Sequence, residues 1–454
     1  MQKNGLVNRG DRKMSNLKIS FIGAGSFGFT YKLVADILSF DNLKAAEFCF
    51  MDIDRERLDN LKILLDSYFR LIGCENKAVY TTNRTEALSD AGFVFNLVKI
   101  GMMEASRQDM NVPKKFGLYQ TIGDTCCVGG IFRGLRTMVF NKEMLLEMEK
   151  VSNKNAVVLN YTNPQAMTVM AAQAVSKIPF IGLCHSVQGT TRAMACTVEI
   201  PYEELNFECA GINHMAFITK FEKDSEDLYP LFKSITENSS MPSGGKYSVS
   251  PELGMVRIEM MRELGYMVTE SSTHFPEYVP YFLKNKHTAE KYHIEIDRYE
   301  KNIEEKEERY FKLIKEARED GLTVANKSDE YGANIINAMT TGVPIKIYAN
   351  VMNDGLIDTL PEDSCVEVVS MVDKNGVQPC RYGSLPTQLS ALCRSNINVH
   401  QLAVEAFLRG DRKYIKYAFM ADPLTASTLT LSEMDKVIDE LLMLQQQYFS
   451  GLFD

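Results

Sequence analysis

The sequence predicts an α/β protein in which an N-terminal doubly wound parallel sheet is followed by a C-terminal α+β domain. Between residues 17 and 204, short apolar segments alternate with segments of helical pattern. This alternation is typical of a parallel sheet covered by helices on both faces. Beyond residue 205 the alternation stops, and a long charged helical stretch precedes two extended segments. A chain of 454 residues is also long for a single core, which favours two packed domains.

The predicted elements follow one another in a regular order. A strand, a glycine turn and a helix are predicted in LKISFIGAGSFGFTYKLVADIL, and a second strand and helix in AEFCFMDIDRERLDNLKILLDSYFRL. Further buried strands are predicted at 91–101, 155–164 and 179–185, helices over 285–320 and toward the C-terminus, and extended segments at 344–351 and 364–372. The predicted organisation is a disordered leader at 1–16, with Met14 as another candidate start, a first domain at 17–204 and a second at 205–454.

Composition excludes several classes of protein. The net charge of −9 argues against a nucleic acid or an anionic membrane as partner, because either would require a basic surface. Apolar runs fall short of the ~18 residues that a membrane span needs, and the polar start lacks the apolar segment of an export signal. The ten cysteines form no CxxC pair, so we expect reduced thiols in a cytoplasmic protein.

A glycine-rich turn predicts a dinucleotide site. The segment GAGSFG at 23–28 fits GxGxxG and lies between a predicted strand and a predicted helix, whose N-terminal N–H groups would face a pyrophosphate. Asp52 closes the second strand, where it would bind the adenosine ribose and repel a 2′-phosphate, which favours NAD over NADP. The alternative is a plain glycine turn with a helix-capping aspartate. The predicted cofactor contacts are Gly23, Gly25, Ser26, Phe27, Gly28, Asp52 and Asn96, of which Asn96 fits a nicotinamide contact and a structural role equally well.

Cys184 and His185 stand side by side at the predicted C-terminal end of a strand in IGLCHSVQGT. Ligands of open α/β sheets bind at such strand ends. Three interpretations are open: a nucleophile with its base, half of a metal site, or two interior residues with no catalytic role. The nucleophile is the weakest of these, because neighbouring strand residues point to opposite faces. A thiolate with the imidazole of His214, in CAGINHMAF, suits a divalent transition metal.

Several segments together resemble glycoside hydrolase family four, and the α-galactosidase (melibiase) branch most closely. The resemblance runs from residue 17 to the C-terminus. It rests on ISFIGAGSFGF, MDID, GDTCCVGGIFRGLRT, NYTNPQAMT, GLCHSVQGT, CAGINHMAF, YMVTESSTHFPEY and NDGLIDTLPEDSCVEV.

The resemblance implies hydrolysis of α-galactosides by an NAD-dependent route rather than by a pair of carboxylates. It implies oxidation at C3 of the sugar, removal of the C2 proton, elimination of the glycosidic oxygen, addition of water and return of the hydride. A divalent ion, expected to be Mn²⁺, would stabilise the enediolate. The resemblance further implies that the 205–454 domain holds substrate and metal and joins a homodimer or homotetramer.

The resemblance also assigns site residues. Cys184 and His214 match the metal ligands, Asn163 a substrate contact, and Asp124 a residue that supports the catalytic base. His185 stands where some relatives carry an acidic proton donor, so its role as general acid is open. The base is predicted to be Tyr278, with Glu270 as the alternative, and an ordinary core tyrosine is an equally good interpretation of Tyr278.

Other functions remain open at this stage. Arg107 is shifted by one position from the arginine with which phospho-sugar members grip phosphate, which favours an unphosphorylated substrate. An α-glucosidase or α-galacturonidase would differ at a few pocket residues only. An NAD-dependent 2-hydroxyacid dehydrogenase would share the fold but need no metal, and an NAD-sensing regulator would need neither Cys184 nor His214.

Overall fold

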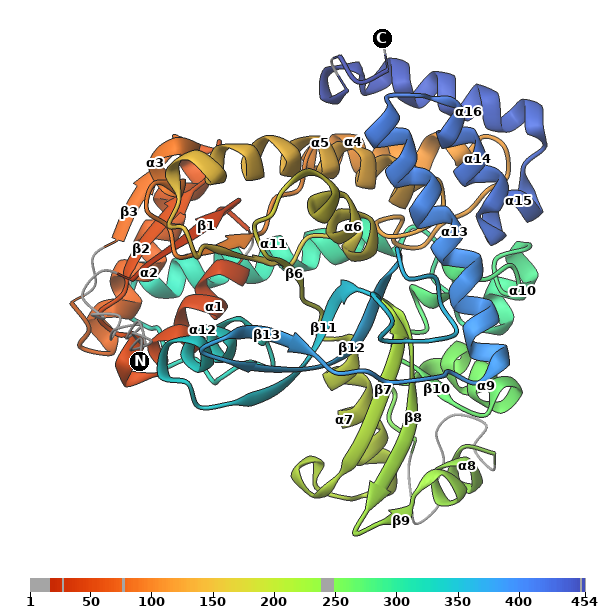
Figure 1. The fold of residues 1–454 in the computed structure, drawn as a ribbon, viewed down its shortest axis with the longest axis horizontal. Coiled ribbons are helices and arrows are strands. Elements are labelled where there is room, and N and C mark those ends of the chain that lie inside the picture. The colour runs from red at the N-terminus through yellow and green to blue at the C-terminus, as the bar shows by residue number, and fades with distance from the viewer. Residues whose placement is uncertain (1–16, 27, 76–77, 238–248, 450, 454) are drawn as a thin grey trace, which may run out of the picture.

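One continuous sheet, with helices on both of its faces, organises the chain (Figure 1). The computed structural model describes residues 17–26, 28–75, 78–237, 249–449 and 451–453. The predicted leader at 1–16, with Met14, and the predicted cofactor contact Phe27 lie outside these residues. Over the described residues, no helix is both long and apolar enough to cross a membrane.

Six parallel strands form the N-terminal part of the sheet, in the order β3-β2-β1-β4-β5-β6. This is the strand order of a Rossmann fold, whose ligands bind beyond the carboxyl ends where the order reverses, here between β1 and β4. The doubly wound prediction is therefore confirmed. The strands are β1 Lys18–Ile22, β2 Glu47–Met51, β3 Ala78–Thr81, β4 Phe93–Asn96, β5 Val157–Asn160 and β6 Phe180–Gly182.

The C-terminal part extends the same sheet with antiparallel strands. β11 pairs with β6, and the order continues β12-β7-β8-β10, with β13 beside β12 and β9 beside β8. The division predicted at 204/205 therefore does not interrupt the sheet, and stays a prediction as a domain boundary. These strands are β7 Asn206–Ile212, β8 Met215–Lys223, β9 Glu226–Asp227, β10 Met267–Val268, β11 Ile345–Met352, β12 Cys365–Asp373 and β13 Gly376–Pro379.

Local sequence signals set the ends of several helices. Asp54 caps α2 by accepting from the N–H of Arg57, and Thr430 with Glu433 forms a capping box on α16. The predicted helical stretch at 285–320 becomes α10 and α11. The helices are α1 Phe29–Leu38, α2 Arg55–Leu71, α3 Arg84–Leu88, α4 Met102–Lys114, α5 Cys127–Val151, α6 Gln165–Val175, α7 Ser186–Val198, α8 Tyr229–Glu237, α9 Gly254–Leu264, α10 Lys286–Lys291, α11 Arg298–Arg318, α12 Gly332–Thr341, α13 Thr387–Arg409, α14 Lys413–Ala421, α15 Pro423–Thr428 and α16 Leu431–Leu444, with short 3₁₀ turns that include η4 Phe275–Tyr278.

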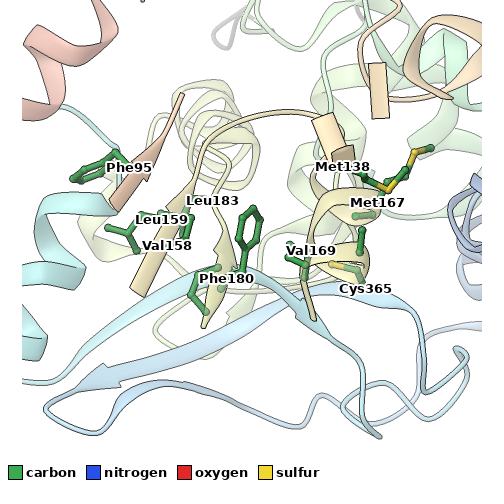
Figure 2. Close-up of a cluster of buried hydrophobic side chains, with 14 of the residues drawn as sticks. Phe95, Met138, Val158, Leu159, Met167, Val169, Phe180, Leu183 and Cys365 are labelled. Atoms are coloured by element: carbon green, nitrogen blue, oxygen red, sulfur yellow. The ribbon is translucent and has the colours of Figure 1, made fainter. Parts of the chain in front are cut away.

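A buried apolar cluster joins the two parts of the sheet to the helices above them (Figure 2). Phe180 of β6 lies among Leu159 of β5, Val169 of α6 and Cys365 of β12, all buried. Full burial of each such side chain contributes about 1.5–3 kcal/mol of transfer free energy. The cluster therefore fixes the strands whose carboxyl ends carry the site.

Candidate active site

The glycine turn takes the conformation that dinucleotide binding needs. Gly23 has φ +81°, and a Cβ there would lie 2.9 Å from the backbone of Leu97 and Val98. Gly28 is the N-cap of α1 with φ +78°. Both conformations favour glycine, and together they aim the N-terminus of α1 at the space above the turn. The Ser26 hydroxyl lies 3.0 Å from that of Thr30, inside the first turn of α1.

Asp52 and Asn96 differ in what they can reach. The Asp52 carboxylate accepts from the N–H of Gly25 at 2.8 Å and from that of Asp54 at 3.0 Å, so it holds the glycine turn at the end of β2, where a ribose would bind. Asn96 is fully buried, and its amide donates to Asn141 at 3.0 Å and Asn160 at 2.8 Å. Both amide hydrogens are used, so the structural interpretation of Asn96 is favoured over a nicotinamide contact.

Cys184 and His214 come from opposite parts of the sheet and meet at the site. Cys184 follows β6, and His214 lies in the two-residue turn between β7 and β8. The Cys184 Sγ lies 3.3 Å from His214 Nε2. Burial raises the pKa of the Cys184 thiol to about 11, so at neutral pH it is a thiol, and a bound cation would favour the thiolate. Two donor atoms facing each other in this way fit a divalent ion.

The His214 ring is held in one orientation by its backbone and by Tyr278. His214 has φ +65°, a conformation that is costly for a non-glycine residue and recurs at functional sites. Its Nδ1 lies 2.9 Å from the Tyr278 hydroxyl, which leaves Nε2 directed at Cys184. Metal-binding histidines usually use their second nitrogen in this manner. Tyr278 has no exposed surface, and burial raises its pKa well above 10.

Glu270 and His274 complete the inner group of side chains. Glu270 Oε2 lies 3.3 Å from His214 Nε2, and the ligand atoms of His214, Glu270 and His274 converge within 4.8 Å of one another. Burial would raise the pKa of Glu270, but the neighbouring His214 and His274 outweigh it and lower that pKa. Glu270 is therefore a carboxylate at neutral pH. His274 was missed by sequence reasoning, although it lies in the quoted segment STHFPEY.

Asp124 stands at the centre of a second polar group, which contacts the first through His274. Its carboxylate lies 3.6 Å from the Arg133 guanidinium, 3.5 Å from His274 Nε2 and 3.4 Å from the Asn163 amide nitrogen. Burial would raise the pKa of Asp124, but Arg133 and His274 outweigh it and hold that pKa well below its ordinary value. Arg133 also donates to the Asn163 carbonyl at 3.1 Å, so the two predicted residues Asp124 and Asn163 share one fixed arrangement.

Glu277 holds the loop that carries Asp124. This carboxylate is fully buried, and its Oε1 accepts from the backbone N–H groups of residues 121, 122 and 123 at 2.5, 2.8 and 2.9 Å. Its Oε2 lies 3.3 Å from His274 Nε2. A ring of N–H groups around one oxygen is a built anion site. Gly123 and Glu277 are 154 positions apart in the sequence, so sequence spacing gives no signal for this contact.

His185 lies apart from the buried group, on the exposed side. Its Nδ1 is 3.3 Å from Glu330 Oε1, and the hydrogen bond to Glu330 raises the pKa of His185 to about 9. His185 is therefore a cation at neutral pH and can donate a proton. Arg107, by contrast, forms an ion pair with Glu300 at 2.8 Å, and both side chains are about half exposed.

The arrangement fits both groups that the sequence implies. The glycine turn, the N-terminus of α1 and Asp52 fit a dinucleotide, and the facing thiol and imidazole fit a divalent ion with positions left for other oxygen ligands. The carboxylates of Glu270 and Asp124 lie on two sides of His274. Such a site can remove a proton next to a carbonyl whose oxygen is held by a cation.

Two family models match the chain. The model described as Family 4 glycosyl hydrolase matches residues 18–200, and that described as Family 4 glycosyl hydrolase C-terminal domain matches residues 209–425. Among known proteins, the chain is 35% identical over 427 residues to an alpha-galactosidase of Bacillus subtilis, covering 93% of this chain and 97% of the relative. It is 30% identical over 446 residues to an alpha-galactosidase of Rhizobium meliloti, covering 96% and 89%. It is 28% identical over 456 residues to an alpha-galacturonidase of Thermoanaerobacter italicus, covering 97% and 98%.

Solved structures share the whole fold. The putative glucosidase lplD from Bacillus subtilis superposes with a TM-score of 0.81 at 25% identity, covering 94% of this chain and 100% of that one. A 6-phospho-alpha-glucosidase from gut microorganisms, solved in complex with NAD and Mn²⁺, superposes with a TM-score of 0.79 at 20% identity, covering 96% and 99%.

Proposed function

The chain belongs to the family 4 glycosyl hydrolases, and from this premise we propose that it hydrolyses unphosphorylated α-galactosides with the help of NAD⁺ and a divalent metal. The observation that carries the proposal is the Cys184–His214 pair, with its 3.3 Å separation and Glu270 beside it. The identity of 35% to an alpha-galactosidase over nearly the full length of both chains supports the substrate class.

The residues that would hold the two cofactors occupy different parts of the strand ends. Residues 23–28 and Asp52 would hold NAD⁺ at the β1–β2 side, and Cys184 with His214 would hold the metal, expected to be Mn²⁺, beyond β6 and β7. When bound, the dinucleotide supplies a hydride acceptor and the metal supplies a Lewis acid for sugar oxygens. Asn163, fixed by Arg133 and next to Asp124, would orient the sugar between them.

Glu270 is the better candidate for the base that removes the C2 proton. Its carboxylate is charged at neutral pH and reaches the metal histidine at 3.3 Å. Tyr278, the base preferred on sequence grounds, has a fully buried hydroxyl that is hydrogen-bonded to His214 Nδ1. That contact supports a positioning role for Tyr278, and Asp124 would act on Glu270 through His274, which lies between them.

His185 is the candidate proton donor to the leaving glycosidic oxygen. Its pairing with Glu330 keeps it protonated at neutral pH, and its ring is exposed on the side of the site where a leaving group would depart into solvent. Replacement of His185 by Phe should slow substrates with poor leaving groups much more than nitrophenyl glycosides. Equal slowing of both would count against this role.

A direct assay tests the proposed activity. Nitrophenyl α-galactoside, α-glucoside and α-galacturonide are each incubated with the protein, NAD⁺, Mn²⁺ and a thiol reductant. We expect release of nitrophenol from the α-galactoside, dependence on both cofactors, and no steady accumulation of NADH. Net NADH formation in proportion to sugar released would refute the hydrolytic cycle.

An α-galacturonidase is the second candidate, because relatives of that activity cover the chain at 28% identity. The cations Lys99 and Arg133 lie close enough to interact with each other and with Asp124, and they would suit a carboxylate at C6. Faster turnover of the α-galacturonide than of the α-galactoside would favour this candidate. We also propose a homodimer or homotetramer, as the family resemblance implies, for which light scattering of the purified protein is the test. A cytoplasmic location is proposed from the ten cysteines, which we expect to be reduced, and cell fractionation is its test.

A further inference from the structure

A row of aligned residues crosses the sheet just below the strand ends that carry the site. Strand pairing places each member beside the next, across β1, β4, β5, β6, β11, β12 and β7 (Figure 1). The row consists of Ile22, Asn96, Asn160, Gly182, Asn350, Glu367 and Gly211. Four of its members are polar, and each of these four is fully buried. Buried polar side chains in mid-sheet are costly unless each is paired, so the row needs a reason.

Most polar groups of the row are paired by hydrogen bonds, within the row or to Gln165 of α6. Asn96 donates to Asn160 at 2.8 Å, and Asn160 donates to Gln165 at 2.7 Å. Asn350 donates to the Gly182 carbonyl and to Glu367 Oε1, both at 3.3 Å. These contacts fix the amides and hold the Glu367 side chain in place.

Glu367 is the exception, because it is a fully buried carboxyl without a cationic partner. Its Oε2 has no hydrogen-bond partner among the described residues, and neither do the Oδ1 atoms of Asn350 and Asn213. Among the residues that the structure describes, no lysine or arginine forms an ion pair with Glu367. Burial raises the pKa of Glu367 to about 7, although His214 and the nearby amides of Asn350 and Asn213 act to lower it. A carboxylate held in this manner is destabilising unless a positive charge lies near.

Two glycines of the row place Glu367 close to the metal pair. Gly182 precedes Cys184 by two positions, and Gly211 precedes His214 by three. The charge of Glu367 acts on Cys184 and that of His214 acts on Glu367. Glu367 lies within β12 and pairs with Gly211 of β7, whereas Cys184 and His214 lie in the loops that follow β6 and β7. Glu367 therefore lies in the sheet beneath the loops that carry the two proposed ligands.

We propose that Glu367 is a positioning residue of the metal centre, a buried negative charge held by Asn350 that offsets the charge of the ion bound at Cys184 and His214. The inference rests on the proposed metal site and adds a residue to it. Residues behind the ligands of a metal contribute about 10–100-fold in metal affinity. On this proposal, the bound metal is the positive charge that balances Glu367 in the buried row.

Titration of the purified protein with Mn²⁺, followed by the electron paramagnetic resonance signal of the free ion, tests the inference without any turnover. We expect Glu367→Gln, which preserves shape and the bond from Asn350, to bind Mn²⁺ about 10–100-fold more weakly. Glu367→Asp, which keeps the charge, should recover part of the lost affinity. The melting temperature of metal-free Glu367→Gln should equal or exceed that of the parent, because a buried unpaired charge is gone.

The controls separate this inference from the metal site itself. Asp422→Asn removes another fully buried carboxylate, one that caps α15, and should leave Mn²⁺ affinity unchanged. If Glu367→Gln binds Mn²⁺ as tightly as the parent while Cys184→Ser binds it more weakly, the role of Glu367 is overturned and the metal site is not. Failure of the parent to bind Mn²⁺, or unchanged binding by Cys184→Ser, would overturn the proposed metal site and the inference with it. If Glu367→Gln does not fold, the test falls to Glu367→Asp. Binding of Mn²⁺ by Glu367→Asp that is no tighter than that of Cys184→Ser would also overturn the role of Glu367.

Discussion

Replacement of Glu277 by glutamine should separate the support of the catalytic loop from the chemistry of the site. The buried Oε1 of Glu277 accepts three backbone N–H groups of the loop at 121–123. A hydrogen bond to a charged acceptor contributes about 1.5–3 kcal/mol and a neutral one about 0.5–1.5 kcal/mol, so loss of the charge costs about 1 kcal/mol for each bond. The new NH₂ group would also face the N–H of Gly123, which lies 3.1 Å from Oε2. We expect a total destabilisation of about 3–4 kcal/mol.

The same change should reduce turnover, because the loop positions Asp124. Misplacement of a catalytic group by about 1 Å can cost about 100-fold in rate. Urea unfolding followed by circular dichroism gives the stability, and initial rates over a range of substrate concentrations give kcat and KM separately. We expect kcat to fall by about 100-fold with a much smaller change in KM.

Asp36→Asn is the matched control for Glu277→Gln. Asp36 is also buried, but it accepts a single backbone N–H, that of Ser328 at 2.8 Å, and its hydrogen-bond partners do not include the loop at 121–123. This variant should lose about 1 kcal/mol without the about 100-fold fall in kcat expected of Glu277→Gln. If the free energy of unfolding of Glu277→Gln lies within about 1 kcal/mol of the parent's and its kcat is unchanged, the contacts of Glu277 with the three N–H groups do not hold the loop in place.

Three further predictions concern the ligands, the base and a buried histidine. Cys184→Ser and His214→Ala should fold but lose metal, measured by elemental analysis, and lose most of their activity; full metal content in either would contradict the pair. In D₂O the parent should incorporate deuterium at C2 of the released sugar, detected by NMR. Glu270→Gln should abolish this exchange with NAD⁺ and metal still bound, whereas Tyr278→Phe should reduce it only partly. Exchange that is abolished in Tyr278→Phe and only reduced in Glu270→Gln would restore Tyr278 as the base. Burial lowers the pKa of His400 to about 4, so folding resists its protonation, and stability from this group is complete above pH 6.5 and is lost as the pH falls toward 4. Between pH 7 and 5 the parent should lose about 2 kcal/mol more than His400→Leu in urea unfolding, and equal losses would refute this assignment.

The sequence predicts the N-terminal half of the fold well, because its signals are local. The glycine turn, the buried apolar strands and the helix after Asp54 each depend on neighbouring residues, and the structure has them where they are expected. The order of the antiparallel strands could not be predicted, because β11 inserts between β6 and β12 from more than 160 positions along the chain. Nothing in a local pattern encodes such a pairing.

The site divides in the same manner. The resemblance assigned Cys184 and His214 to a metal, and the structure brings Cys184 Sγ within 3.3 Å of His214 Nε2, while their role as ligands stays a prediction. His274, Glu277 and Glu330 could not be predicted, because their roles depend on contacts with distant loops and with each other. A preference between Tyr278 and Glu270 depends on three-dimensional contacts: the Tyr278 hydroxyl is enclosed and bonded to His214 Nδ1, and the Glu270 carboxylate lies 3.3 Å from His214 Nε2. The identity of the base stays a proposal.

The insertion of β11 and β12 between β6 and β7 has a consequence for synthesis of the chain. A ribosome releases Cys184 and His214 early, but the two strands that separate their strands in the sheet span residues 345–373. A nascent chain stalled before residue 345 therefore carries both proposed metal ligands without the strands that bring them into register. Its parallel strands can already pair, because domains fold as their segments emerge. We expect such a truncated product to bind Mn²⁺ much more weakly than the full chain.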